Sequence, residues 1–313
     1  MEFVKFTADL VPAAEALAAA AYEAERRAVP SLPEAAVPSL LCFTDWDTSI
    51  AAVEDGKLLG FLAAYPPFFP AFTTNVSGAY SPAQAHGVLP GYEARVWPRL
   101  YQAAAELWVR AGCGSHTITL YAHDRAAQEA LYRYGFGIRC MDAVRPTDAI
   151  GAAAVESYRF DWCSDWDALA PLRRGLSDHL GMSPCFAVTT EEHYQSWDAR
   201  SRVDGRRAFA AWKDGQPVAY IEVAANEGEH YCTEAEGMRN LCGAYCLPSH
   251  RSSGLMPALL EALIAQLSAD GSTRLGVDFE SFNPTAYGFW RKYFEIYTHS
   301  LVRRIDESAL KHR

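Results

Sequence analysis

An internal repeat constrains the fold of this chain more than any other feature of its sequence. Two Asp-Gly pairs, beginning at Asp55 and Asp214, lie 159 residues apart, and the same spacing separates Asp124 from Asn283. The stretch "SGAYSP" in the first half returns as "CGAYCLP" in the second. A duplication explains this constant spacing better than chance, and a period of 159 residues is far too long for a solenoid. We therefore predict a duplicated domain.

The length of 313 residues suits two domains of ordinary size, each able to bury a core. The halves divide in the polar and small-residue stretch between Val144 and Phe160, which has the composition of a linker. We predict domains at 1–150 and 151–313.

Each half has the same predicted order of strands and helices. Residues 51–65 and 209–223 each indicate a hairpin, with Asp-Gly in the turn. Apolar spacing predicts one helix at Trp97–Arg110, with Pro98 in its opening turn, and another at Gly254–Ala269. Hairpins mixed with helices predict the α+β (mixed α/β) class, with a mixed, mostly antiparallel sheet flanked by helices in each half.

The composition is that of a globular protein without a broadly basic surface. The 28 basic and 38 acidic residues give a formal charge of −10, which argues against a general nucleic-acid or anionic-membrane partner. The longest apolar stretch is too short to span a bilayer, and the first residues lack the order of a signal peptide, so we expect a cytoplasmic protein. The eight cysteines include no C-x-x-C pair, and we expect buried reduced thiols and no metal site.

One segment of the second half points to an anion site. Small residues and Arg251 lie between a predicted strand and a predicted helix in the segment "LPSHRSSGLMPALLEALI". The unpaired N–H groups of a helix start attract anions, and small residues let a phosphate approach the backbone. An ordinary strand-to-helix connection with serine caps is the plainer alternative. The motifs G-x-x-x-x-G-K-[ST] and G-x-G-x-x-G are absent from the sequence.

With the repeat, this segment resembles a tandem acyltransferase of the GNAT superfamily, over nearly the whole chain. In that family a strand ends in an apolar-Pro step and R/Q-x-x-G-x-G/A opens a helix. Pro248, Arg251 and Gly254 fit this pattern, whereas Met256 stands where a small residue is usual. The resemblance implies that acetyl-coenzyme A is the acyl donor.

The resemblance also assigns parts of the donor to particular residues. The loop and helix start would hold the pyrophosphate, and the strand before them would pair with the pantetheine arm and polarise the thioester carbonyl. Two further residues would line the other side of the cleft. The predicted cofactor-binding residues are Tyr245, Cys246, Leu247, Arg251, Ser252, Ser253, Gly254, Leu255, Met256, Asn283 and Phe289.

The first half departs from the family pattern. Its segment Ser81–Arg95 is longer by about six residues and lacks R-x-x-G-x-G/A, and Pro90-Gly91 breaks the chain well before a helix that we expect to open near Trp97. We therefore expect donor binding in the second half alone, with a structural or acceptor-shaping role for the first.

The catalytic residues are less clearly marked. Family members often use a tyrosine in the last helix to reprotonate the leaving thiolate; the first half keeps it as Tyr132, whereas the second has Trp290, whose indole is no acid near neutral pH. Tyr293 lies one helical turn away and is our substitute, with a core aromatic as the alternative. For deprotonation of the amine, we favour Glu280 and then Glu236.

Glu222 on a hairpin strand is a further candidate for the base, and each carboxylate has an ordinary ion pair as its alternative. The predicted function is direct acetyl transfer from acetyl-CoA to an amine, on a small molecule, with no covalent intermediate. The alternatives are a non-catalytic acyl-CoA binder or scaffold derived from such an enzyme, and a protein or peptide N-acetyltransferase.

Overall fold

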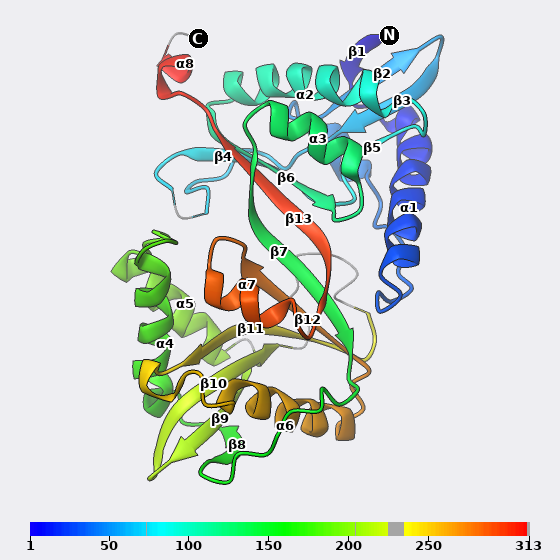
Figure 1. The fold of residues 1–313 in the computed structure, drawn as a ribbon. Coiled ribbons are helices and arrows are strands. Elements are labelled where there is room, and N and C mark those ends of the chain that lie inside the picture. The colour runs from blue at the N-terminus through cyan, green and yellow to red at the C-terminus, as the bar shows by residue number, and fades with distance from the viewer. Residues whose placement is uncertain (73, 204, 225–234, 312–313) are drawn as a thin grey trace. The chain divides into compact units, whose positions relative to one another are not determined.

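The computed structural model describes residues 1–72, 74–203, 205–224 and 235–311 (Figure 1). The chain forms two compact units. The first comprises Met1–Asp142 together with Ile296–Arg313, and the second comprises Ala143–Glu295. Their boundary falls inside strand β7 (Gly137–Pro146), a few residues before the expected division at 150, and the C-terminal strand belongs to the first unit instead of the second.

The first unit contains two groups of paired strands, in the orders β1-β2-β3-β5 and β4-β6-β13. Its long helix α2 and the shorter α3 contact each other, and α2 also contacts β2, β3 and β6. The helices are α1 (Val11–Ala28), α2 (Glu93–Arg110), α3 (Arg125–Arg133) and α8 (Glu307–Lys311). The strands are β1 (Glu2–Lys5), β2 (Ile50–Glu54), β3 (Lys57–Leu62), β4 (Ser77–Ser81), β5 (His86–Val88), β6 (Cys113–Tyr121) and β13 (Glu295–Arg304).

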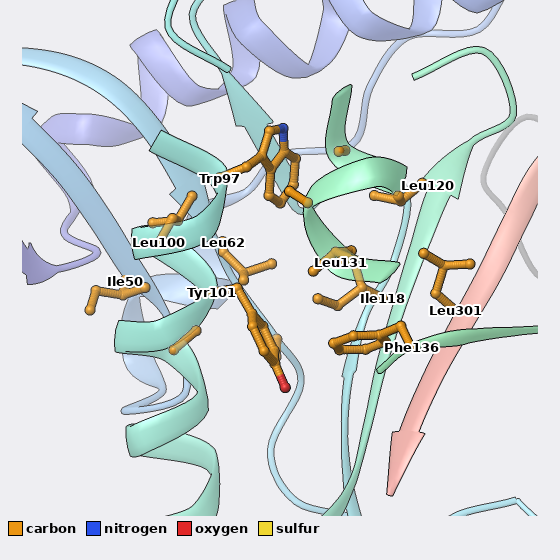
Figure 2. Packing of buried hydrophobic residues seen from close by; sticks show 14 of the residues in the cluster. Ile50, Leu62, Trp97, Leu100, Tyr101, Ile118, Leu120, Leu131, Phe136 and Leu301 are labelled. Carbon is orange, nitrogen blue, oxygen red and sulfur yellow. The ribbon is translucent and has the colours of Figure 1, made fainter. Parts of the chain in front are cut away.

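The core of the first unit forms around one face of α2. Figure 2 shows Trp97, Leu100 and Tyr101 of this helix pointing toward apolar side chains from strands and from α3. Burying a side chain of this size contributes about 1.5–3 kcal/mol. Leu301 of β13 belongs to the same cluster, because β13 pairs antiparallel with β6 from Thr298↔Tyr121 onward. The strand that follows the second repeat therefore completes the core of the first.

The second unit is built on a sheet with the order β12-β11-β10-β9-β8. In it β11 and β12 are parallel, whereas β11 with β10, β10 with β9 and β9 with β8 are antiparallel. The helices are α4 (Trp166–Gly181), α5 (Glu191–Val203), α6 (Leu255–Ala269) and α7 (Pro284–Trp290). The strands are β8 (Arg159–Cys163), β9 (Arg207–Lys213), β10 (Gln216–Ala224), β11 (Met238–Cys246) and β12 (Arg274–Glu280).

Both predicted hairpins are confirmed, and their turns are alike. Asp55 and Gly56 have φ angles of 51° and 74°, and Asp214 and Gly215 have 49° and 78°. Two successive positive φ angles define the turn that matches strand twist, and Asp-Gly is among its preferred sequences. The strands on either side are β2 with β3 and β9 with β10.

Asp124 and Asn283, the second pair of residues 159 positions apart, are both helix N-caps. The Asp124 carboxylate accepts from the backbone N–H of Ala127 at 3.0 Å, at the start of α3. The Asn283 side-chain oxygen accepts from the N–H groups of Thr285 and Ala286, at the start of α7. The 159-residue spacing therefore places equivalent caps on equivalent helices, and the fold is a mixed α/β fold built twice.

Helix α2 begins earlier than the sequence predicted. It starts at Glu93 instead of Trp97, so Pro98 lies inside the helix and not in its first turn. The helix tolerates this proline because the residues around it, Val96, Trp97 and Leu100, are fully buried in the core.

The cysteines also differ from the expectation of buried thiols. Among the described residues all are free, but Cys42 is exposed and Cys140, Cys185 and Cys242 are half-buried. Cys232 lies outside the described residues. In the part of the chain that the structure describes, no helix is long and apolar enough to cross a bilayer.

Candidate functional site

The site begins where two strands of the second unit separate. The parallel ladder between β11 and β12 runs from Met238↔Arg274 to Leu241↔Val277 and stops there. On its other side β11 stays paired with β10 as far as Cys246. From Leu241 onward, one edge of β11 is therefore no longer paired with β12.

The alternation of an antiparallel ladder tells which backbone groups face that edge. The N–H of Leu247 donates to the carbonyl of Val218 at 3.0 Å, in register with the β10–β11 pairs. Hydrogen-bonded and non-hydrogen-bonded pairs alternate, so the peptide groups of Ala244 and Cys246 point away from β10. We call this side of β11, from Ala244 to Cys246, the open edge.

A bulge lies at the inner end of the open edge. Glu222 pairs with Gly243, but the next residue, Val223, pairs with Leu241, so Cys242 is the extra residue of β11. The bulge and the separation of β11 from β12 coincide. An extended ligand that lies along the open edge can therefore reach no further along β11 than this bulge.

The outer end of the open edge leads into the start of α6. Ser252 has a φ of 60°, and Gly254, the N-cap of α6, has a φ of 81°, a conformation that favours glycine. The first N–H groups of a helix, here those of Leu255 and Met256, have no intrahelical partner. Pro257, the third residue of α6, has no backbone N–H.

Arg251 is held over the end of β11. Its Nε donates to the carbonyl of Cys246 at 3.0 Å, and its guanidinium lies 5.2 Å from the centre of the Tyr245 ring. The cation is thereby placed beside the helix start, where it adds to the positive end of the α6 dipole. A bidentate anion such as a phosphate fits this combination.

A cleft of about 520 Å³ joins the open edge to the helix start. Helix α4 forms part of its wall, and Gly175 lets this helix come close, since a Cβ there would lie 2.7 Å from the Tyr245 ring. Of the predicted cofactor-binding residues, those that line the cleft are Tyr245, Cys246, Arg251, Ser252, Gly254, Leu255, Met256, Asn283 and Phe289.

Two predicted cofactor-binding residues do not line the cleft. The side chain of Leu247 packs against the apolar cluster that includes Leu169 and Leu172 of α4. The hydroxyl of Ser253 turns back and donates to the carbonyl of His250 at 2.7 Å.

Sequence reasoning missed His179, which lines the cleft from α4. Its Nε2 lies 3.3 Å from the Asn283 side-chain oxygen and 3.2 Å from the Thr285 hydroxyl. The signal was present, because Leu172, Gly175, Leu176 and His179 have the spacing of one helix face.

The predicted catalytic residues lie outside the residues that line the cleft. Glu280 is half-buried at the end of β12, and Glu236 is exposed in the turn before β11. Helix α7 ends at Trp290, so Tyr293 lies in the following turn, where its ring packs on Phe289 at 5.2 Å between centroids. Trp290 itself lines the cleft and is nearly buried.

Glu222, the further candidate for the base, is fully buried and ion-paired. Its carboxylate lies 3.0 Å from Arg206 and 3.5 Å from Arg173. Burial raises the pKa of the Cys246 thiol to about 11, so this cysteine stays protonated at neutral pH and is a poor nucleophile. Within the described residues, no group of three or more potential metal ligands is present.

Residues 175–295 match the sequence model of the Acetyltransferase (GNAT) family. The chain contains a GNAT-family domain. This domain spans most of the second unit, including the open edge, the start of α6 and both walls of the cleft. No curated protein sequence matches the chain significantly.

Solved structures share the fold over the length of the chain. A GCN5-related N-acetyltransferase from Sphaerobacter thermophilus is 15% identical, with a TM-score of 0.61, covering 96% of this chain and 95% of that one. A functionally unknown conserved protein from Staphylococcus epidermidis is 9% identical, with a TM-score of 0.50, covering 82% of this chain and 94% of that one. At these identities the likeness concerns the fold alone.

The first unit has a cleft at the equivalent place, with a volume of about 560 Å³. The run Val88-Leu89-Pro90 precedes Cys246-Leu247-Pro248 by 158 residues, so β5 matches the end of the GNAT domain's β11. The match was missed because β4 and β5 together replace one strand. Strand β4 pairs with β6, the chain turns at Pro82, and β5 then pairs with β3.

The edge of β5 is filled, unlike the open edge of the GNAT domain. The Nε2 of His86 is 2.7 Å from the carbonyl of Thr119 on β6, and burial lowers the pKa of His86 to about 4. This neutral imidazole bridges the two strands. Glu93, 158 residues before Arg251, begins α2, and its carboxylate accepts from the N–H of Gly91 at 2.8 Å.

Two further carboxylates line the first-unit cleft. Glu25 is almost fully buried and accepts from the ring of His123 at 2.8 Å, and burial raises its pKa. Burial also raises the pKa of Asp124, and Glu93 adds to this effect. Arg27 and Arg125 also line this cleft, so its charged side chains are of both signs.

Proposed function

We propose that the chain is an acetyl-CoA-dependent N-acetyltransferase that transfers an acetyl group directly to the amine of a small molecule. The observation that carries this proposal is the open edge of β11 running into the start of α6, inside a GNAT-family domain. An extended arm rich in amides fits the first feature, and a diphosphate fits the second.

In this proposal the donor lies along one continuous path. The peptide groups of Ala244 and Cys246 pair with the pantetheine arm, and the N–H groups from Ser252 to Met256, with Arg251, hold the diphosphate. Tyr245 and Phe289 contact the arm from the two walls. Backbone N–H groups near the bulge polarise the thioester carbonyl, since fixed donors stabilise the oxyanion that develops during acyl transfer.

Binding of the donor is tested by thermal unfolding with and without acetyl-CoA. We expect a rise in Tm for the native chain, because a ligand that binds the folded state stabilises it. Gly254→Glu places a carboxylate at the head of α6 and should abolish the rise. No rise in the native chain would refute the proposal.

Gly271→Glu is the matched control for that variant. Gly271 lies just past the other end of α6, has a φ of 85° and has open space around its Cβ position. The backbone strain and the added charge are therefore similar, but the change is remote from the cleft. This variant should keep the rise in Tm.

A second candidate function is a non-catalytic acyl-CoA binder. Trp290 lines the cleft where family members often carry a tyrosine, and neither Glu280, Glu236 nor Tyr293 lines it. Thiol release from acetyl-CoA across a panel of primary amines separates the two functions. Turnover that falls in Glu280→Gln supports the enzyme and its proposed base, whereas binding without thiol release supports the binder.

A further inference from the structure

Two side chains that line the first-unit cleft are deeply buried, yet each has a polar atom without a partner in the described chain. Trp97 is 1% exposed, and its indole N–H has no hydrogen-bond partner among the described residues. His86 is 4% exposed, and its Nε2–H donates to the carbonyl of Thr119 at 2.7 Å. Its other nitrogen, Nδ1, is therefore an acceptor, and nothing in the described part of the chain donates to it.

Both of these nitrogens are open to the cleft. Neither is among the fully enclosed unpartnered atoms of the described residues, so each keeps accessible surface, and the cleft is the space that both rings line. Figure 2 shows the nitrogen of Trp97 on the side of its ring that faces away from Leu62 and Leu131. The rings of Trp97 and His86 contact each other, with centroids 5.4 Å apart. A ligand can therefore accept from one and donate to the other at neighbouring points.

The same cleft contains carboxylates that are removed from water. Glu25 is 2% exposed and accepts from the ring of His123, and the half-buried Asp124 accepts from the N–H of Ala127. A carboxylate has about four acceptor sites, so both groups can accept further bonds. Burial raises the pKa of both, and a cation bound beside them would offset this effect because it favours the charged form.

Two arginines without partners line the exposed part of the cleft. Arg27 lies near the end of α1 and Arg125 is the first residue of α3, and both side chains are exposed. Neither guanidinium has a hydrogen-bond or ion-pair partner within the residues that the structure describes. With Glu93, the charged lining is three carboxylates and two guanidinium groups, which favours a zwitterion or a cation over an anion.

We propose that the first-unit cleft is a binding site for an amino acid. The ammonium group of the ligand donates to Glu25, Asp124 and Nδ1 of His86. Its carboxylate accepts from the indole N–H of Trp97 and from the exposed guanidinium groups. An amino acid carries this donor and this acceptor on one carbon, as the neighbouring nitrogens require, and a basic side chain fits the charge balance best. The inference goes beyond the proposed function, because the cleft belongs to the other unit.

Calorimetric titration of the full chain with L-lysine tests the recognition of both groups. 1,5-Diaminopentane lacks only the carboxylate of lysine, and 6-aminohexanoate lacks only its α-amino group. Each should bind at least about ten-fold more weakly than L-lysine, because one set of charged partners stays unfilled. Equal affinity for either compound would refute the proposal, and so would tighter binding of L-glutamate.

Variants at both ends of the ligand tie this binding to the first-unit cleft. Glu25→Gln removes a charge but keeps an acceptor for His123, and it should weaken L-lysine binding about ten-fold. The double variant Arg27→Ala/Arg125→Ala should weaken it to a similar extent. Arg110→Ala/Arg133→Ala is the matched control, since both side chains are exposed on α2 and α3 and neither lines the cleft. Unchanged affinity in the first two variants would refute the proposal.

A spectroscopic measurement reports on the buried donor without any substitution. In proton–nitrogen NMR spectra the indole signal of Trp97 should shift when L-lysine is added, because its N–H gains an acceptor. Trp108 is the internal control, since its Nε1–H already donates to the carbonyl of Thr48 at 2.7 Å and its signal should stay in place. A Trp97 signal that does not move at millimolar L-lysine would refute the contact.

The outcomes are independent of those for the proposed function. If neither L-lysine nor L-alanine binds, water alone fills the cleft and this inference is wrong, whatever the response to acetyl-CoA. If L-lysine binds as described but acetyl-CoA does not raise Tm, the proposed function fails and the amino-acid site stands.

Discussion

The clefts of the two units differ at two points of a common plan. In the second unit the strand edge at Ala244 is open, whereas in the first the imidazole of His86 spans from β5 to β6. At the helix start the second unit has Arg251, and the first has Glu93. From these two differences we expect the clefts of the duplicated units to accept different ligands.

The reversed charge gives the largest expected effect. Arg251→Glu should weaken acetyl-CoA binding roughly 1000-fold, about 4 kcal/mol, because a phosphate loses its guanidinium and gains a repelling carboxylate. Calorimetric titration measures the change. The reciprocal variant Glu93→Arg should leave this affinity as it was. A large effect of Glu93→Arg would show that the first cleft also takes part in donor binding.

The filled edge makes the first unit sensitive to acid. Burial lowers the pKa of His86 and of His116 to about 4, below the ordinary value of 6.5. Between pH 6.5 and pH 4 these two histidines are protonated in the unfolded chain but stay neutral in the folded unit. Their contribution to stability is therefore complete above pH 6.5 and decreases as the pH falls toward 4. Each histidine accounts for up to about 3 kcal/mol.

Two carboxylates of the same unit act in the opposite sense. Burial raises the pKa of Glu25 and of Asp124, so their contribution to stability grows as the pH falls. We still expect the first unit to open before the second at pH 4.5. Pulse proteolysis in urea, with fragments of each unit identified by mass spectrometry, measures this order, and earlier opening of the second unit would contradict it.

Buried carboxylates offer a third comparison. Glu222→Gln should cost about 2 kcal/mol, because it removes the buried carboxylate that pairs with both Arg173 and Arg206. Glu25→Gln should cost less than 1 kcal/mol, since burial already disfavours its charge and an amide oxygen can still accept from His123. Urea unfolding midpoints measure both, and equal losses would break the contrast.

The smallest effect concerns a feature that the units share. Gly56→Ala and Gly215→Ala should each cost about 1 kcal/mol, because both glycines have positive φ angles and open space around the Cβ position. The same unfolding experiment should give equal losses. A clear inequality would show that the two hairpin turns are not equivalent.

The features that were predictable from sequence are local. The Asp-Gly turns and the caps at Asp124 and Asn283 depend on side chains acting on their own backbone, so the residue types suffice. The run around Arg251 could be assigned to a helix start for the same reason. These elements fixed the duplicated mixed fold and much of the cleft.

The features that were missed depend on distant partners. The division of one strand into β4 and β5 shows only in their pairing with β6 and β3. The start of α2 was misplaced because Pro98 favours a first turn, whereas burial of Trp97 and Leu100 holds it within the helix.

Because β13 pairs with β6, synthesis of the polypeptide imposes an order of events. A ribosome making this protein releases β6 roughly 180 residues before the segment at 296–304 that pairs with it from Thr298 to Arg304. Throughout that interval the nascent first half holds a bare edge of nine buried residues, which invites association with other chains. The first half therefore cannot be expressed as an independent gene product without leaving that edge of β6 uncovered.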